Sequence, residues 1–311
     1  MLEKLFSVDK NSTIAQIPLD LGEILIKIPV ADMRGGAPGP TVVVTAGMDG
    51  DEYTGIEAAY RMIEEMQNAQ FAGRLIIIPI VNIPGFENEC SHCPIDGQFP
   101  KNIFPGNSAG SATEKIIDWL VQNYLMGATL WIDLHSGAIT EGLNPFVYLY
   151  ETDSDRVDVL TQELVEAAIS PTIVLQTASW GSKQARLAKM GCTYVLAESG
   201  ARGNSLEEDV QRHIVLINDA MSVAGMLAAR PIQGIAPLIL YEVVYVNAPY
   251  NGLWRARPIG TSINKGDEVG EWCRLDGSNK KTICAPVSGT PLWWKETMSM
   301  RQGDVLLAIA K

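Results

Sequence analysis

Three side chains that could bind a metal ion stand directly after two buried segments of the chain. Asp49 and Glu52 lie in AGMDGDEYTG, after the β-branched run at residues 41–45, and His135 follows the apolar run at residues 128–134. Both runs are typical of central strands. Ligand sites in open α/β sheets lie beyond the carboxyl ends of strands, so we expect the three side chains at one edge. Two carboxylates and one imidazole, with a position left for water, suit a hydrolytic metal ion.

The same acidic residues also have a purely structural interpretation. Acids that follow a strand often cap the next helix, and Asp51 or Glu52 could cap the helix expected from Ile56. The D-x-x-E spacing alone favours capping. His135 is the stronger indication of a site, because the chain has only three histidines, at positions 92, 135 and 213. The residues alone therefore leave capping and metal binding both open.

Strands and helices are expected to alternate over the first three quarters of the chain. The expected strands are residues 22–30, 41–45, 74–81, 128–134, 145–150, 172–177 and 193–197, and the expected helices are residues 56–67, 112–125, 155–169, 184–190 and 205–228. Between them, residues 82–110 form a long stretch rich in Pro, Gly and Asn, a kind that is usually functional or disordered. The alternation predicts an α/β fold with helices on both faces of a central sheet.

The pattern changes after residue 231. From there to the end, turn signals such as Asn-Gly and Asp-Gly-Ser separate short strands, expected at residues 238–246, 282–285 and 305–309. We therefore predict two domains, an α/β domain over residues 1–231 and a small all-β domain over residues 232–311. A length of 311 residues agrees with two domains, at about 150 residues for each.

Composition and charge exclude several classes of function. Hydrophobic residues make up 47% of the chain and charged residues 19%, which is typical of a globular protein. The formal net charge of −12 repels nucleic acid and anionic membranes, so neither is an expected partner. No apolar run reaches the roughly 18–20 residues of a membrane-spanning helix. The first twelve residues, MLEKLFSVDKNS, lack the apolar region of a signal peptide, and five cysteines leave one unpaired, so we expect a cytoplasmic location.

Cys90 and Cys93, with His92 between them, form a C-x-x-C motif. Such a pair can bind metal or act as a redox couple, but this one lacks a second pair and a thioredoxin-like context. Packing of the loop is the simpler interpretation. The alternative is that His92 or a cysteine contributes to the metal site.

Four short segments of the chain form an ordered set. They are residues 47–52 (GMDGDE), 101–106 (KNIFPG), 133–137 (DLHSG) and 198–200 (ESG). In order and spacing this set resembles the succinylglutamate desuccinylase/aspartoacylase family of the zinc carboxypeptidase-like superfamily, over about residues 20–230. The resemblance implies a mixed central sheet and metal-dependent hydrolysis of the amide bond of a small N-acyl amino acid or related compound.

The resemblance also implies roles for single residues. Asp49, Glu52 and His135 would hold one Zn²⁺ ion per chain, and Glu198 would act as the catalytic base and then as the acid. The family has histidine where this chain has Asp49. An aspartate oxygen binds zinc at nearly the same distance as a histidine nitrogen, but its charge also suits harder cations such as Mn²⁺ or Fe²⁺.

A second departure concerns the substrate. The family has an Asn-Arg pair before F-P-G, and here Lys101 and Asn102 stand in its place. Arginine holds a carboxylate as a planar fork, whereas lysine is a point charge. Lys101, Asn102 and Arg186 are the candidates for binding a small anionic substrate, and solvated surface charges are the alternative.

The C-terminal segment resembles the barrel-sandwich domain that many family members carry. No lysine occupies the turn that is modified in lipoyl and biotinyl carriers, so a covalent cofactor is not expected. We expect this domain to shape the active-site entrance or to form a contact in a homo-oligomer. The sequence thus predicts a metal-dependent deacylase. The alternative is a non-catalytic or altered-metal member of the fold that binds a small molecule.

Overall fold

The strands of the first part of the chain form one large mixed sheet. The computed structural model describes residues 12–22, 24–229 and 236–311, and the predicted domain boundary and most of the N-terminal segment MLEKLFSVDKNS lie outside them. The strand order is β1-β2-β4-β3-β5-β9-β7-β8-β10. The strands are β1 (Ser12–Asp20), β2 (Leu25–Arg34), β3 (Ala37–Ala46), β4 (Ala72–Ile78), β5 (Leu130–His135), β7 (Phe146–Glu151), β8 (Thr172–Thr177), β9 (Thr193–Glu198) and β10 (Leu238–Leu240). The central strands β4, β3, β5 and β9 are parallel, and β7 runs antiparallel to β9.

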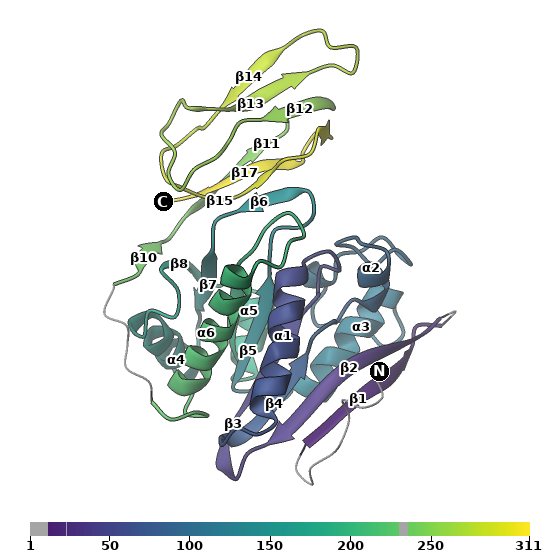
Figure 1. Ribbon diagram of the computed structural model, residues 1–311, viewed down its shortest axis with the longest axis vertical. Helices are drawn as coiled ribbons and strands as arrows, with labels where there is room; N and C mark the ends of the chain where they lie inside the picture. The colour runs from purple at the N-terminus through teal and green to yellow at the C-terminus, as the bar shows by residue number, and fades with distance from the viewer. Residues whose placement is uncertain (1–11, 23, 230–235) are drawn as a thin grey trace.

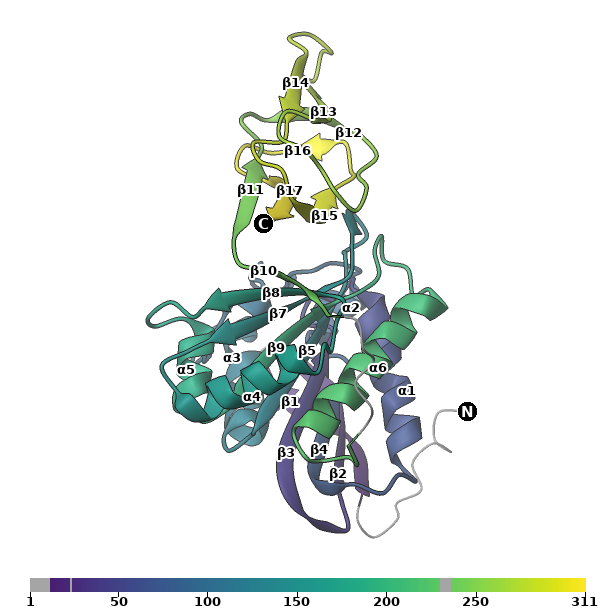
Figure 2. The same ribbon diagram turned by 90° about the vertical axis from the view of Figure 1, so that its left-hand side faces the viewer.

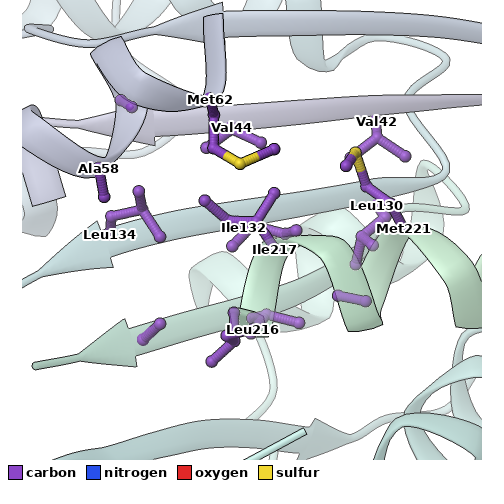
Figure 3. Close-up of a cluster of buried hydrophobic side chains, with 14 of the residues drawn as sticks. Val42, Val44, Ala58, Met62, Leu130, Ile132, Leu134, Leu216, Ile217 and Met221 are labelled. Carbon is purple, nitrogen blue, oxygen red and sulfur yellow. The ribbon is translucent and has the colours of Figure 1, made fainter. Parts of the chain in front are cut away.

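Helices cover both faces of this sheet, as the sequence predicts. On one face lie α1 (Tyr53–Met66), α4 (Asp155–Glu166) and α6 (Glu207–Val223), and on the other lie α3 (Ala112–Leu120) and α5 (Lys183–Lys189). Figure 3 shows the first core, in which Val44 of β3 and Ile132 of β5 pack against Met62 of α1 and Ile217 of α6. The mixed α/β fold is confirmed.

Strand β5 shows how the sequence builds both a core and a site. Side chains alternate between the faces of a strand. Leu130, Ile132 and Leu134 therefore enter the core with α1 and α6, while Trp131 packs on the opposite face. Asp133 and His135 share that opposite face with Trp131, so the strand itself aligns them.

The long stretch at residues 82–110 contains α2 (Ile83–Glu87) and a single 3-10 turn at Pro100–Asn102. The helix expected at residues 112–125 is α3 followed by a π-helical turn at Val121–Leu125. None of the helices in the described ranges is long and apolar enough to cross a membrane.

The C-terminal part consists of two four-stranded antiparallel sheets, β11-β17-β15-β6 and β14-β13-β12-β16. Their strands are β6 (Glu141–Leu143), β11 (Val243–Asn247), β12 (Gly252–Ala256), β13 (Glu268–Cys273), β14 (Lys281–Cys284), β15 (Thr290–Lys295), β16 (Ser299–Met300) and β17 (Val305–Ala310). The two sheets share a core that contains Trp254, Trp272 and Trp294. They form an open sandwich, and the described strands do not close into a barrel.

Two short strands tie the C-terminal sheets to the large sheet. The prediction of a single strand at residues 238–246 is wrong. This segment forms two strands, β10 in the large sheet and β11 in a C-terminal sheet. The ladder breaks because the N–H groups of Tyr241 and Glu242 both donate to the carbonyl of Lys311. In the other direction, β6 follows β5 in the chain and pairs with β15. Figures 1 and 2 show the C-terminal sheets beyond the edge where β5 leads into β6. The division into two domains stays a prediction.

Candidate metal centre

The carboxyl ends of three neighbouring parallel strands form the edge that carries most of the candidate residues. In the register of β5 and β9, His135 lies directly beside Glu198. The turn that follows β3 carries Asp49 and Glu52 to the same edge. Gly50 lies in this turn, and a Cβ atom there would be 2.1 Å from a backbone carbon of α2. Glycine is therefore required for the turn to pack against α2.

Asp49, Glu52 and His135 converge into one buried cluster. Nδ1 of His135 lies 2.8 Å from Oε2 of Glu52 and 4.0 Å from Oδ2 of Asp49. One ligand atom of each residue lies within 4.8 Å of the other two, and no side chain of the three is more than 5% exposed. The fold thus brings together the three residues that the sequence singles out.

The side chain of Glu52 does not cap the helix that follows it. It occupies the N-cap position of α1, but its side chain makes no capping hydrogen bond. Instead, Oε2 accepts a hydrogen bond of 3.0 Å from the backbone N–H of Ser136. Asp51 accepts a hydrogen bond of 2.7 Å from the hydroxyl of Ser91. The capping interpretation is therefore wrong for Glu52, whose carboxylate faces the cluster.

These residues fit a divalent metal ion. Oδ1 of Asp49 is buried and accepts no hydrogen bond, a costly state that a cation would relieve. Ligand atoms in a tetrahedral zinc site lie about 3.3 Å apart, which falls between the two separations from Nδ1 of His135. Nε2 of His135 lies 3.3 Å from Oδ2 of Asp133. A carboxylate at one ring nitrogen favours the proton there and leaves the other nitrogen free to bind metal.

The cluster also contains a cation of its own. Nζ of Lys101 forms a salt bridge with Oδ2 of Asp49. Burial raises the pKa of Asp49, the charge of Glu52 raises it further and Lys101 lowers it, so that it lies at about 7. Burial lowers the pKa of Lys101, but the charges of Asp49 and Glu52 outweigh this and hold it above the usual value. One carboxylate of the cluster is thus neutralised by the protein.

Glu198 lies beside the cluster on the neighbouring strand. Its Oε2 is buried and has no hydrogen-bond partner. Burial and the charge of Glu52 raise the pKa of Glu198 well above its usual value. A carboxyl group in this environment can exchange protons with groups near neutral pH, as a general base and acid must.

The remaining predicted residues do not join the cluster. Asn102 is exposed. Arg186 is also exposed, and its Nε donates a hydrogen bond of 3.0 Å to the carbonyl of Gly181 in its own loop. Cys93 is buried, and Sγ of Cys90 donates to the carbonyl of His92, so the C-x-x-C motif packs the loop. All five cysteines are free.

Sequence reasoning gave no role to the residues behind His135. Asp133 is fully buried, with Oδ1 accepting 2.6 Å from the hydroxyl of Thr45 and Oδ2 accepting 2.9 Å from the hydroxyl of Tyr194. His213 of α6 contacts the carbonyl of His135 at 3.1 Å. The position of Asp133, two residues before His135 on one strand, was a signal in the sequence. Thr45, Tyr194 and His213 gave none.

Comparison with known proteins identifies the family. The family model of the succinylglutamate desuccinylase/aspartoacylase catalytic domain matches residues 38–224 of this chain. The chain belongs to this family. The predicted family is therefore confirmed.

One relative is similar to this chain in sequence, and two solved structures are similar to it in fold. It is 29% identical over 187 residues to the N-alpha-acetyl-L-2,4-diaminobutyric acid deacetylase of Halomonas elongata. That match covers 60% of this chain and 54% of the relative, so the chain spans about half the length of the curated relative it matches. A succinylglutamate desuccinylase/aspartoacylase structure from Rhodobacter sphaeroides has a TM-score of 0.83 at 21% identity, covering 98% of this chain and 96% of that chain. The product-bound ectoine utilization protein EutE from Ruegeria pomeroyi has a TM-score of 0.83 at 23% identity, covering 98% and 97%. Both structures show the same fold.

Against the desuccinylase/aspartoacylase pattern, the two departures of this chain lie in contact. By the motif resemblance, Asp49 stands where the family has histidine, and Lys101 belongs to the pair that stands where the family has Asn-Arg. Each of these pairs carries one positive charge, and in this chain that charge forms a salt bridge with Asp49.

Proposed function

We propose that the chain is a metal-dependent deacylase that hydrolyses the amide bond of a small N-acyl amino acid. Asp49, Glu52 and His135 hold the ion, and Glu198 acts as base and then as acid. The observation that carries this proposal is the buried cluster of three ligand atoms beside an unpaired glutamate on the adjacent strand. All of these residues lie in the α/β domain proposed for residues 1–231.

A bound ion, zinc or a harder cation such as Mn²⁺ or Fe²⁺, would polarise the substrate carbonyl and acidify a water molecule. The remaining chemistry belongs to side chains of the protein. Glu198 accepts a proton from the attacking water and delivers it to the leaving amine, for which its raised pKa is suited. Glu52 holds the ring of His135 from one side and Asp133 holds it from the other.

The charges near the cluster favour a substrate with an amino group over a dicarboxylate. Lys101 forms a salt bridge with Asp49, and the Arg186 guanidinium donates a hydrogen bond within its own loop. Neither side chain is therefore free to bind a second carboxylate of the substrate. Glu141 is close enough to Lys101 and Asp49 for their charges to shift its pKa, which burial raises. The relative from Halomonas elongata is named for an N-acetyl diamino acid. We therefore propose N-acetyl diamino acids as the first substrates to test.

The test combines metal content with turnover. The protein is loaded with Zn²⁺, Mn²⁺ or Fe²⁺, and amine release is followed from N-acetyl-2,4-diaminobutyrate, N-acetylaspartate and N-succinylglutamate. Glu198→Gln should lower turnover by at least 10²-fold, the lower bound for losing a general base, and should keep one ion per chain. Loss of the ion from Glu198→Gln would contradict the role of base.

The salt bridge between Lys101 and Asp49 favours one second candidate function. The ammonium already supplies a positive charge at the cluster, as a site that has lost its metal would need. A binding protein that retains the fold would then take up N-acyl amino acids without hydrolysis. Absence of stoichiometric metal under every loading condition, together with measurable ligand binding, would support this candidate over the deacylase.

A further inference from the structure

A half-buried lysine that the proposed reaction does not use lies close to the cluster. Lys183 is the first residue of α5, and its Nζ lies 4.3 Å from the ring centre of Tyr194 and 5.2 Å from that of Trp131. It donates a hydrogen bond of 2.8 Å to the hydroxyl of Tyr194. Burial lowers the pKa of Lys183, and the charge of Asp133 opposes this. An ammonium group that lies over two neighbouring rings needs strong partners to offset its lost hydration.

A continuous chain of contacts leads from this lysine to the metal ligand. The hydroxyl of Tyr194 donates 2.9 Å to Oδ2 of Asp133. The same Oδ2 lies 3.3 Å from Nε2 of His135, whose Nδ1 faces Glu52. The links from Lys183 to Asp133 are hydrogen bonds, whereas Oδ2 of Asp133 and Nε2 of His135 form a charge contact without hydrogen-bond geometry. A change at Lys183 therefore has a physical route to the ring of His135, although α5 supplies no ligand.

We propose that Lys183 and Tyr194 are positioning residues that fix the metal ligand His135 through Asp133. The ammonium polarises the phenol of Tyr194, and the phenol holds Oδ2 of Asp133 in place. Asp133 then fixes the orientation of the imidazole and keeps its proton on Nε2, so that Nδ1 stays directed at the cluster. This inference rests on the proposed metal site.

The physical chemistry separates this role from simple packing. Removing one member of a buried charged network leaves its partners uncompensated and lowers stability. Loss of an outer partner of a metal-bound histidine also weakens metal binding, typically 10–100-fold. Lys183→Met should therefore destabilise the metal-free protein and, in the protein that remains folded, weaken the affinity for metal. A purely structural lysine would lower stability and leave the metal affinity of the folded protein unchanged.

The experiment measures metal affinity by competition with a chromophoric chelator in the full chain. Lys183→Met and Tyr194→Phe should each weaken Zn²⁺ affinity 10–100-fold, and the double variant should be no weaker than the weaker single one. Lys183→Arg, which keeps the cation, should recover most of the affinity. Lys189→Met, at an exposed lysine on the same helix, is the matched control and should bind like the wild type.

A second measurement does not depend on metal. With ¹⁵N-labelled histidine, the three histidines give separate ring signals. Those of His135 should move in Lys183→Met and Tyr194→Phe, and those of His92 should stay. Tyr194→Phe removes a single oxygen atom, so it carries the test if Lys183→Met fails to fold.

Three results would overturn the positioning role. If the wild type binds metal and both variants bind it equally well with unmoved His135 signals, the role is wrong and the proposed function stands. If the two losses of affinity simply add, the residues do not act through one route. If the wild type binds no metal, this inference and the proposed function both fail.

Discussion

At the scale of single residues, the ion pair between Asp49 and Lys101 should set the pH above which the cluster can bind metal. A carboxylate binds a cation only when it is deprotonated, and the pKa of Asp49 lies at about 7 in the metal-free protein. Metal affinity should therefore fall as the pH drops below about 7. Because Lys101 lowers the pKa of Asp49, Lys101→Met should move this fall to higher pH. Metal titrations at several pH values measure the midpoint, and an unchanged midpoint would contradict the pairing.

At the scale of elements, His213 joins α6 to the end of strand β5. This imidazole is 1% exposed, and Nε2 lies 3.1 Å from the carbonyl of His135. Burial lowers the pKa of His213 to about 4, against 6.5 when unfolded. The unfolded chain therefore binds the proton first, so stability is full above pH 6.5 and is lost as the pH falls toward 4. The loss from this residue should reach about 2 kcal/mol at pH 5.

Urea unfolding of the wild type and of His213→Gln, at neutral pH and at pH 5, isolates this contribution. The variant lacks the titrating group, so its stability should fall less between the two conditions. The control is His92→Gln, which removes a histidine in the loop at residues 82–110 and should leave the fall in stability unchanged. An equal fall in the wild type and in His213→Gln would contradict the assignment to His213.

At the scale of the whole molecule, the two parts of the chain exchange strands: β6 adds to a C-terminal sheet and β10 adds to the large sheet. The β6 strand pairs with β15 in the C-terminal sandwich, and β10 pairs with β8 in the large sheet. Thermal unfolding should therefore occur in one transition. A metal ion at about 100 times its Kd should stabilise the fold by about 2.7 kcal/mol and raise the Tm by roughly 4 °C. Calorimetry with and without Zn²⁺ measures both, and Glu52→Gln should abolish the shift.

The sequence by itself determined the alternating core of the large sheet and the candidate metal ligands that follow its strands. Apolar runs such as residues 41–45 and 128–134 can be satisfied only in buried central strands, and polar groups placed directly after them must reach the strand ends. The short strand β6 was not predicted, and β10 was predicted only as one strand with β11, because the sheet to which each belongs depends on partners distant in the chain.

Only the tertiary structure decided how the site is held. The contact between Lys101 and Asp49 joins positions 52 residues apart, and the route from Lys183 to His135 crosses α5, β9 and β5. Neither lysine differs in sequence from a solvated surface lysine such as Lys189. Packing removes part of their water and leaves particular carboxylate, phenol and ring groups as the partners, and packing is a property of the fold and not of the local sequence.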